Sequence, residues 1–334
     1  MDITLISRYF NTKNGGAGSH SKLIYEGLKK RKQLNLNILS QDESFISSYN
    51  QLSYLFFTSL DLKRLLNKEE YQNQDIYHAL TPLESKYINK RKGVASVLDF
   101  IPLMEKAGFM SNLFANYFND SIKQASQCER VIANNQDIKS KLIESYNVNE
   151  SSIEVIPPPI NDNFYPKDNE SNVFTVGTIS NLMTRKRVNI LIESFLKADI
   201  PNSQLLIGGN GVEKDNLIKL AANDKRIKFV GFVPDDKMND FYNILDVFVF
   251  PTKVEGYGMP IVEAMACGKP VITLKDSIIP SDIKNRTIIC EKDELTNILK
   301  SESFDFNKKD NINFYKQHSI DKITDKIINV YESI

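Results

Sequence analysis

The residues best placed for chemistry lie between positions 246 and 270, in the stretch DVFVFPTKVEGYGMPIVEAMACGKP. Two carboxylates, Glu255 and Glu263, bracket a loop that carries Gly256 and Gly258. Glycine adopts backbone conformations closed to other residues and lets main-chain N–H groups approach a ligand closely. The stretch therefore predicts a binding site for a polar ligand.

Regular elements on both sides must hold this loop in place. Residues 247–250 are all apolar and favour a strand that is buried on both faces. A helix is expected over about 259–267, with Pro260 in its first turn and Gly268 as its stop, and residues 271–274 read as the next strand. Because ligands of open α/β sheets bind outside the carboxyl ends of the strands, the loop falls where a ligand is expected.

The whole register, EGYGMPIVE followed by AMACGKPV, resembles the signature of retaining glycosyltransferases of family 4, which have the two-domain GT-B architecture. The resemblance implies that Glu255 holds hydroxyls of the donor sugar and that Glu263 accepts from the nucleotide ribose. It also places Gly258, Met259 and Pro260 against the donor. Either glutamate alone has a simpler explanation, as a solvated loop residue or as an acid favoured by the helix dipole.

Composition narrows the class of protein. The 334 residues are enough for two α/β domains, and 42 basic residues balance 42 acidic ones, so no broad nucleic-acid footprint is expected. The three cysteines are widely spaced and form no C-x-x-C pair, which favours a reducing compartment. No signal region or long apolar span is apparent. We expect a cytoplasmic protein that is soluble or peripheral on the inner face of a membrane.

The N-terminal half begins with a strand at residues 3–6, a long loop and a helix from about 19 to 32. Gly15 and Gly16 are expected just before that helix, where unpaired N–H groups favour an anion. The resemblance implies that this glycine pair faces the diphosphate of the donor across the cleft. A plain flexible turn is the alternative.

Further strands are expected at 34–39, 75–78, 94–98 and 130–133, and helices at 111–127 and 136–146, which is the alternation of a parallel, helix-flanked sheet. In the resembled family a histidine followed by aspartate approaches the donor sugar. Leu98 stands in place of that histidine here, whereas Asp99 is kept. His78 could replace it as a sugar contact, although a structural role in hydrogen bonding is the more common one for a lone histidine.

The segment at 107–118 is apolar and aromatic, and basic residues Lys86, Lys90, Arg91 and Lys92 precede it. It could form an acceptor-facing or lipid-facing lip. An ordinary amphipathic core helix beside a solvated basic turn is the preferred interpretation, because such stripes usually pack a helix.

The proline-rich run at 157–166 reads as the linker to a second alternating series of strands and helices. We expect an N-terminal domain over 1–160, a nucleotide-sugar domain over 170–317, and a C-terminal helix at about 318–334 that crosses back to the first domain, with two Rossmann-like domains facing across a cleft. The two halves show no sequence repeat.

Basic residues in VGTISNLMTRKRVNILIESF are the candidates for stabilising a leaving diphosphate. Lys186 matches the lysine of the resembled family's G-R…K-G segment. Thr178 stands where that segment has arginine and Arg187 where it has its second glycine, so Arg185 is proposed to supply the missing charge. Because cations oppose the dipole at a helix N-terminus, the cluster indicates an anion between them.

Two more stretches match donor contacts of the family: Gly209 in LLIGGNG, and Phe232 with Val233 in FVGFVP. Lys253 could neutralise Glu255 or be an ordinary surface lysine. No D-x-D or histidine-containing cluster is apparent, so neither a metal nor a cofactor is expected. No close pair of nucleophile and acid is apparent either, and the resemblance implies front-face transfer to a glycan, lipid-linked or small-molecule acceptor. A nucleotide-sugar epimerase, or a degenerate binding protein, is the alternative.

Overall fold

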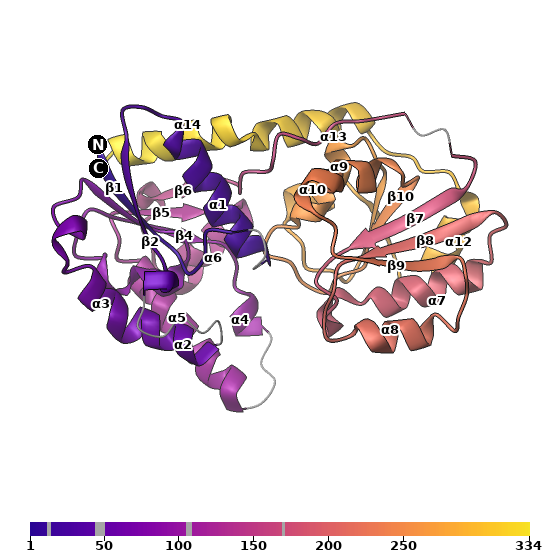
Figure 1. Cartoon of the computed structure of the whole chain (residues 1–334), viewed down its shortest axis with the longest axis horizontal. Helices are drawn as coiled ribbons and strands as arrows, with labels where there is room; N and C mark the ends of the chain where they lie inside the picture. The colour runs from indigo at the N-terminus through magenta and orange to yellow at the C-terminus, as the bar shows by residue number, and fades with distance from the viewer. Residues whose placement is uncertain (12–14, 44–50, 105–108, 169–170) are drawn as a thin grey trace. The chain divides into compact units, whose positions relative to one another are not determined.

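The computed structural model describes residues 1–11, 15–43, 51–104, 109–168 and 171–334. It divides into two compact units, one made of Met1–Ile160 with His318–Ile334 and one of Asn161–Gln317. Each unit contains a six-stranded parallel sheet with helices on both faces (Figure 1). The predicted fold class, two Rossmann-like α/β domains with a C-terminal helix that returns to the first, is confirmed. No helix among the described residues is long and apolar enough to cross a membrane.

The sheet of the first unit has the order β2-β1-β3-β4-β5-β6. All neighbouring strands pair in parallel. The strands are β1 (Asp2–Ile6), β2 (Asn35–Leu39), β3 (Ile76–Ala79), β4 (Gly93–Val97), β5 (Arg130–Ala133) and β6 (Ile153–Val155). The chain reverses its winding direction between β1 and β3, and this switch point is where doubly wound sheets bind ligands.

Two helices from opposite ends of the chain cover one face of this sheet. They are α1 (Gly15–Lys29) and α14 (Ile320–Glu332), and both pack on the cluster that contains Leu5, Ile76 and Val94. The remaining helices of this unit are η2 (Gln41–Glu43), α2 (Gln51–Phe56), η3 (Phe57–Asp61), α3 (Leu62–Leu65), η4 (Glu69–Tyr71), η5 (Pro82–Tyr87), α4 (Ile101–Met104), α5 (Phe109–Ala125), α6 (Gln136–Tyr146) and η6 (Glu150–Ser152). The short helix η8 (Lys316–His318) contains the point at which the chain returns from the second unit to the first.

The start of α1 corrects the prediction from the sequence. The helix begins at Gly15 rather than near residue 19, so Gly15 and Gly16 form its first turn instead of the loop before it. The physical reason is that glycine, although typical of turns, also adopts helical backbone angles, so a glycine pair does not exclude a helix. The N–H groups of this first turn still point out of the helix end, as an anion site requires.

The sheet of the second unit has the order β12-β11-β10-β7-β8-β9, which is the strand order of a dinucleotide-binding domain. Its strands are β7 (Phe174–Ile179), β8 (Ser203–Gly208), β9 (Ile227–Gly231), β10 (Val247–Phe250), β11 (Val271–Leu274) and β12 (Ile288–Cys290). Here the winding direction reverses between β7 and β10. The loops that follow these two strands therefore meet at the switch point.

Helices on both faces complete the second unit (Figure 1). They are η7 (Thr184–Lys186), α7 (Val188–Ala198), α8 (Lys214–Leu220), α9 (Asp235–Asn243), α10 (Met259–Ala266), α11 (Ser281–Lys284), α12 (Leu295–Ser301) and α13 (Lys308–Tyr315). The apolar sides of α7, α8 and α12 share one core cluster with β7, β8, β10 and β11. As predicted, α10 starts next to Pro260 and stops at Gly268, whose φ is +70°.

Candidate active site

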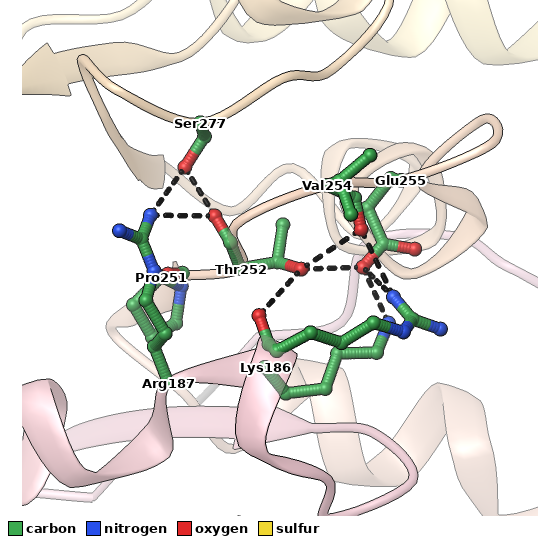
Figure 2. A network of polar contacts seen from close by, with 8 residues as sticks. Lys186, Arg187, Pro251, Thr252, Val254, Glu255 and Ser277 are labelled. Carbon is green, nitrogen blue, oxygen red and sulfur yellow. Dashed lines mark hydrogen bonds and ion pairs between the residues drawn. The ribbon is translucent and has the colours of Figure 1, made fainter. Parts of the chain in front are cut away.

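The candidate site lies at the switch point of the second unit, where the β7 loop meets the β10 loop. Lys186 Nζ forms an ion pair with Glu255 Oε1, and Arg185 Nη1 lies 3.2 Å from the same oxygen. Thr252 Oγ1 donates to that oxygen over 2.7 Å. Figure 2 shows Lys186 and Thr252 directed toward the carboxylate of Glu255. The anion that the basic cluster predicted is thus a carboxylate of the protein itself.

Main-chain hydrogen bonds fix the two loops against each other. The N–H of Lys253 donates to the carbonyl of Arg185 over 2.7 Å. The N–H of Glu255 donates to Ile278 over 2.9 Å, and the N–H of Ile278 donates back to Lys253 over 2.8 Å. Glu255 is therefore held by its backbone as well as by its side chain.

Burial makes these charges effective. The side chains of Lys186 and Glu255 are 9% and 10% exposed, so little water screens the pair. The ammonium of Lys186 also lies 4.9 Å from the centre of the Phe250 ring. Lys253, in contrast, is exposed, and the ion pairs of Glu255 found in the described residues come from Arg185 and Lys186.

Glu263 lies on α10 behind the loop. It is partly buried, and Tyr242 Oη donates to its Oε2 over 2.7 Å. Burial raises the pKa of this carboxyl to about 7, because few polar groups replace the lost water. Gly258 precedes the helix with a φ of +96°, so a residue with a side chain would be strained there. Met259 and Pro260 form the first turn of α10 and are partly exposed.

The other predicted donor contacts of this unit border the same edge of the sheet. Gly209 follows β8 with a φ of +98°, and a Cβ at this position would overlap the carbonyl oxygen of Ser180. Phe232 follows β9 and is 60% exposed, with Val233 partly exposed beside it. Side chains and backbone at the ends of β7, β8, β9 and β10 are thus grouped at one edge, as a nucleotide-sized ligand would need.

Two residues proposed in the first unit have structural partners. His78 is fully buried, and its ring nitrogens lie 2.7 Å from Tyr331 Oη and 2.9 Å from Ser96 Oγ. Burial lowers its pKa to about 3. Both nitrogens are therefore engaged inside the core, which is the structural hydrogen-bonding role expected as the more common one, and the sugar contact of His78 stays a prediction. Asp99 accepts from the N–H of Ile101 over 2.9 Å at the start of α4 and remains partly exposed.

Thr178 and Leu98 are the residues that replace charged or ionisable residues of the family pattern. Thr178 is buried inside β7, where its hydroxyl has no hydrogen-bond partner among the described residues, and a threonine supplies no charge to the site. Leu98 is partly buried after β4. Within the ranges that the structure describes, no group of three or more His, Cys, Asp or Glu side chains could hold a metal ion.

A glutamate that the sequence reasoning missed lies at the switch point of the first unit. Glu84, on η5 after β3, is fully buried and accepts from the N–H of Arg8 over 3.1 Å. The hydroxyls of Tyr54 and Thr81 donate to its two oxygens. The run Thr81-Pro-Leu-Glu84 has the spacing of a capping box, which could have drawn attention to it.

Comparison with known proteins finds relatives for part of the chain. Residues 161–300 match the model of the family described as glycosyl transferases group 1. The O-antigen biosynthesis glycosyltransferase WclY of Escherichia coli is 29% identical over 170 residues, which are 47% of this chain and 46% of that protein. The mannosylfructose-phosphate synthase of Agrobacterium fabrum is also 29% identical over 170 residues, or 43% and 37%. The matches thus span less than half the length of these relatives.

Solved structures extend the likeness to the whole chain. Anabaena HepE, in complex with UDP and glucose, superposes with a TM-score of 0.73 at 20% identity and full coverage of both chains. The sucrose-phosphate synthase of Thermosynechococcus elongatus reaches 0.76 at 14% identity, covering 99% and 98%. The chain has the GT-B fold, and residues 161–300 of its second unit match the model of the glycosyl transferases group 1 family.

Proposed function

We propose that the protein is a retaining, metal-independent glycosyltransferase of family 4 that moves a sugar from a nucleoside-diphosphate sugar to an acceptor hydroxyl. The observation that carries the proposal is the convergence of Lys186 and Arg185 on Glu255, at the switch point of a domain that matches the group 1 family. The donor class agrees with HepE, which binds UDP and glucose.

The charges of the site suit the reaction. As the bond between the sugar and the diphosphate breaks, negative charge grows on the leaving phosphate, and fixed cations stabilise it most in a poorly hydrated site. Lys186 and Arg185 supply that charge, and Arg185 can offer two N–H donors to one phosphate group. In the ligand-free chain, Glu255 balances both cations, and with donor bound its carboxylate accepts from sugar hydroxyls.

Retention follows from front-face transfer in this proposal. The leaving phosphate takes the proton of the acceptor hydroxyl, and the new bond from the sugar carbon to the acceptor oxygen forms on the face from which the phosphate leaves. The protein then needs no covalent nucleophile. Glu263 is proposed to accept from the ribose, Phe232 and Val233 to border the base, and the N–H groups of Gly15 and Gly16 to meet the diphosphate.

The acceptor is proposed to be a glycan, a lipid-linked saccharide or a small molecule, handled by the first unit in the cytoplasm. Leu113 on α5 is 48% exposed, which is compatible with contact at the inner face of a membrane. The part of the proposed lip at residues 107–108 lies outside the described residues.

The test is nucleotide release from a panel of nucleotide sugars, with and without acceptors, by the wild type and Glu255→Gln. The variant keeps the shape of the side chain and removes its charge, and we expect release to fall by roughly 100-fold. Glu294→Gln, an exposed glutamate in the same unit, should leave release unchanged.

Two other outcomes would reject transfer. Donor binding without release under any condition would favour the degenerate binding protein that Thr178 and Leu98 allow. Conversion of the donor sugar without loss of nucleotide would favour an epimerase.

A further inference from the structure

Arg187 has a backbone conformation that its side chain makes costly. Its φ of 50° and ψ of 35° lie in the left-handed region, at the residue that precedes α7. In the segment that the sequence resembles, glycine stands at this position, and glycine alone adopts it without a penalty from Cβ. An arginine that persists in such a conformation calls for an explanation in what its side chain does.

The guanidinium group of Arg187 joins three separate segments. It starts at the head of α7 and donates to the carbonyl oxygens of Pro251 and Thr252, each over 2.8 Å, on the β10 loop. It also forms a two-point ion pair with Asp276 over 2.6 and 2.8 Å and reaches Ser277 Oγ over 3.2 Å, both after β11. The side chain of Arg187 is 17% exposed, so its bonds to the β10 loop and to Ser277 are partly shielded from water, whereas the carboxylate of Asp276 lies at the surface.

Thr252, on the β10 loop, has partners on both sides. Ser277 Oγ donates to the carbonyl of Thr252, which also accepts from Arg187. The side chain of Thr252 points the other way and donates to Glu255 Oε1. Figure 2 shows Arg187 and Ser277 on one side of the loop and Lys186 with Glu255 on the other. Thr252 therefore links Arg187 to the carboxylate of Glu255, because its carbonyl accepts from Arg187 and its hydroxyl donates to Glu255.

We propose that Arg187 is a positioning residue that fixes the loop 251–255 so that Glu255 faces Lys186 and Arg185. It does not touch Glu255, because its N–H groups are directed to Pro251, Thr252, Asp276 and Ser277. A planar fork is needed for this role, since it must meet two carbonyls and a carboxylate at once. The role in catalysis rests on the proposed function, whereas the hold on the loop does not.

The experiment compares Arg187→Ala, Arg187→Lys and the control Arg226→Ala. Arg226 is a partly buried arginine of the same unit that pairs with Asp224 and Asp199 away from the site, so its loss removes similar bonds. We expect Arg187→Ala to lower kcat/KM for nucleotide release by roughly 100-fold and Arg226→Ala to leave it unchanged. A lysine side chain cannot reach all of these acceptors at once, so we expect the kcat/KM of Arg187→Lys to lie between those of the wild type and Arg187→Ala.

A second readout does not depend on turnover. Amide hydrogen exchange at Lys253, Glu255 and Ile278, whose N–H groups bridge the loops, should become faster in the Arg187 variants and not in Arg226→Ala. Added millimolar guanidinium should restore part of the turnover and of the exchange protection to Arg187→Ala, because it refills the vacated position. It should not rescue Lys186→Ala.

The inference is overturned if exchange at these amides is unchanged, or if activity falls without faster exchange, since Arg187 would then act on the donor directly. If Arg187→Ala does not fold, Arg187→Lys carries the same comparison. A wild type that releases no nucleotide from any donor would defeat the proposed function and leave the exchange arm to decide the hold of Arg187 on the loop.

Discussion

Both units place a glutamate at the switch point of their sheet, but they surround it differently. In the first unit, Glu84 follows β3 and accepts from the N–H of Arg8 on the β1 loop and from the hydroxyls of Tyr54 and Thr81. In the second unit, Glu255 follows β10 and receives Lys186 and Arg185 from the β7 loop. The position in the fold is equivalent, whereas the charge around it is not.

This difference assigns separate tasks to the two sheets. Burial raises the pKa of Glu84 to about 7, although hydrogen bonds from Thr81 and Tyr54 oppose the shift, so this carboxyl can be neutral near physiological pH. Glu255 stands between two cations, which can also meet a diphosphate. The switch point of a doubly wound sheet therefore provides the position for the carboxyl group. The residues of the two adjoining loops determine whether cations surround that group.

The largest effect is expected from removal of Lys186, one of the two cations that distinguish the surroundings of Glu255 from those of Glu84. We expect Lys186→Ala to reduce nucleotide release by roughly 100- to 1000-fold, because the charge on the leaving phosphate loses its buried cation. The fold should persist, since Glu255 keeps its bonds to Arg185 and Thr252. Initial rates of release and circular dichroism on the same preparation measure both effects.

Lys253→Ala is the matched control, an exposed lysine two positions before Glu255. Its rate should equal that of the wild type. Equal rates for Lys186→Ala and wild type would remove Lys186 from the mechanism.

Much of the fold could be predicted because its signals are local. The buried strand at 247–250, the helix that Pro260 opens and Gly268 closes, and the helix at 136–146 all follow from short patterns, and the structure confirms them. The missed strand β12 has only three residues and is partly exposed, which leaves little periodicity to detect. The start of α1 was misplaced because a pair of glycines is typical of a turn, although glycine also adopts helical backbone angles.

The site was harder to predict where it depends on contacts between distant segments. Lys186 and Glu255 were identified from their motifs, and their contact follows from the strand order. Glu84 was missed because its partners come from separate segments, Arg8 on the β1 loop and Tyr54 on α2. Arg187 was seen as a departure from glycine, but its bonds to Asp276 and the β10 loop are tertiary and have no local signal.

The pH dependence of stability tests whether Glu84 of the first unit is neutral in the folded protein. The pKa of Glu84 in the folded state, about 7, lies above its ordinary value of 4.5. The protein thus holds this proton where the unfolded chain has released it, so the contribution is fully present below pH 4.5 and is lost as pH rises through 7. A shift of this size corresponds to a loss of up to about 3 kcal/mol.

Glu84→Gln should remove this slope. Urea unfolding of both proteins at about pH 5 and about pH 8 gives the difference between their free energies of unfolding, and that difference should move in favour of the variant at the higher pH. Glu263, also with a pKa of about 7, contributes equally to both proteins and cancels. A difference that does not change with pH would show that Glu84 is charged in the folded protein.

A smaller effect on stability is expected in the first unit alone, because that unit contains α14 from the end of the chain. Gly27 of α1 lies against that helix, where a Cβ would overlap Thr324 Oγ1. Gly27→Ala should destabilise the first unit by about 1 kcal/mol, because an overpacking cost of about 1–3 kcal/mol is offset by the better helix propensity of alanine. Exchange of amides in β1 and β3 against those in β10 and β11 measures the effect by unit.

Gly16→Ala is the control for this helix, because a Cβ there meets nothing within 4 Å. It should leave the exchange of β1 and β3 unchanged. The double variant Gly27→Ala with Thr324→Ala should recover stability, since the smaller side chain makes room for the added methyl group. If Gly27→Ala slows exchange in the first unit instead, helix propensity outweighs packing, and α1 and α14 have room to separate without loss.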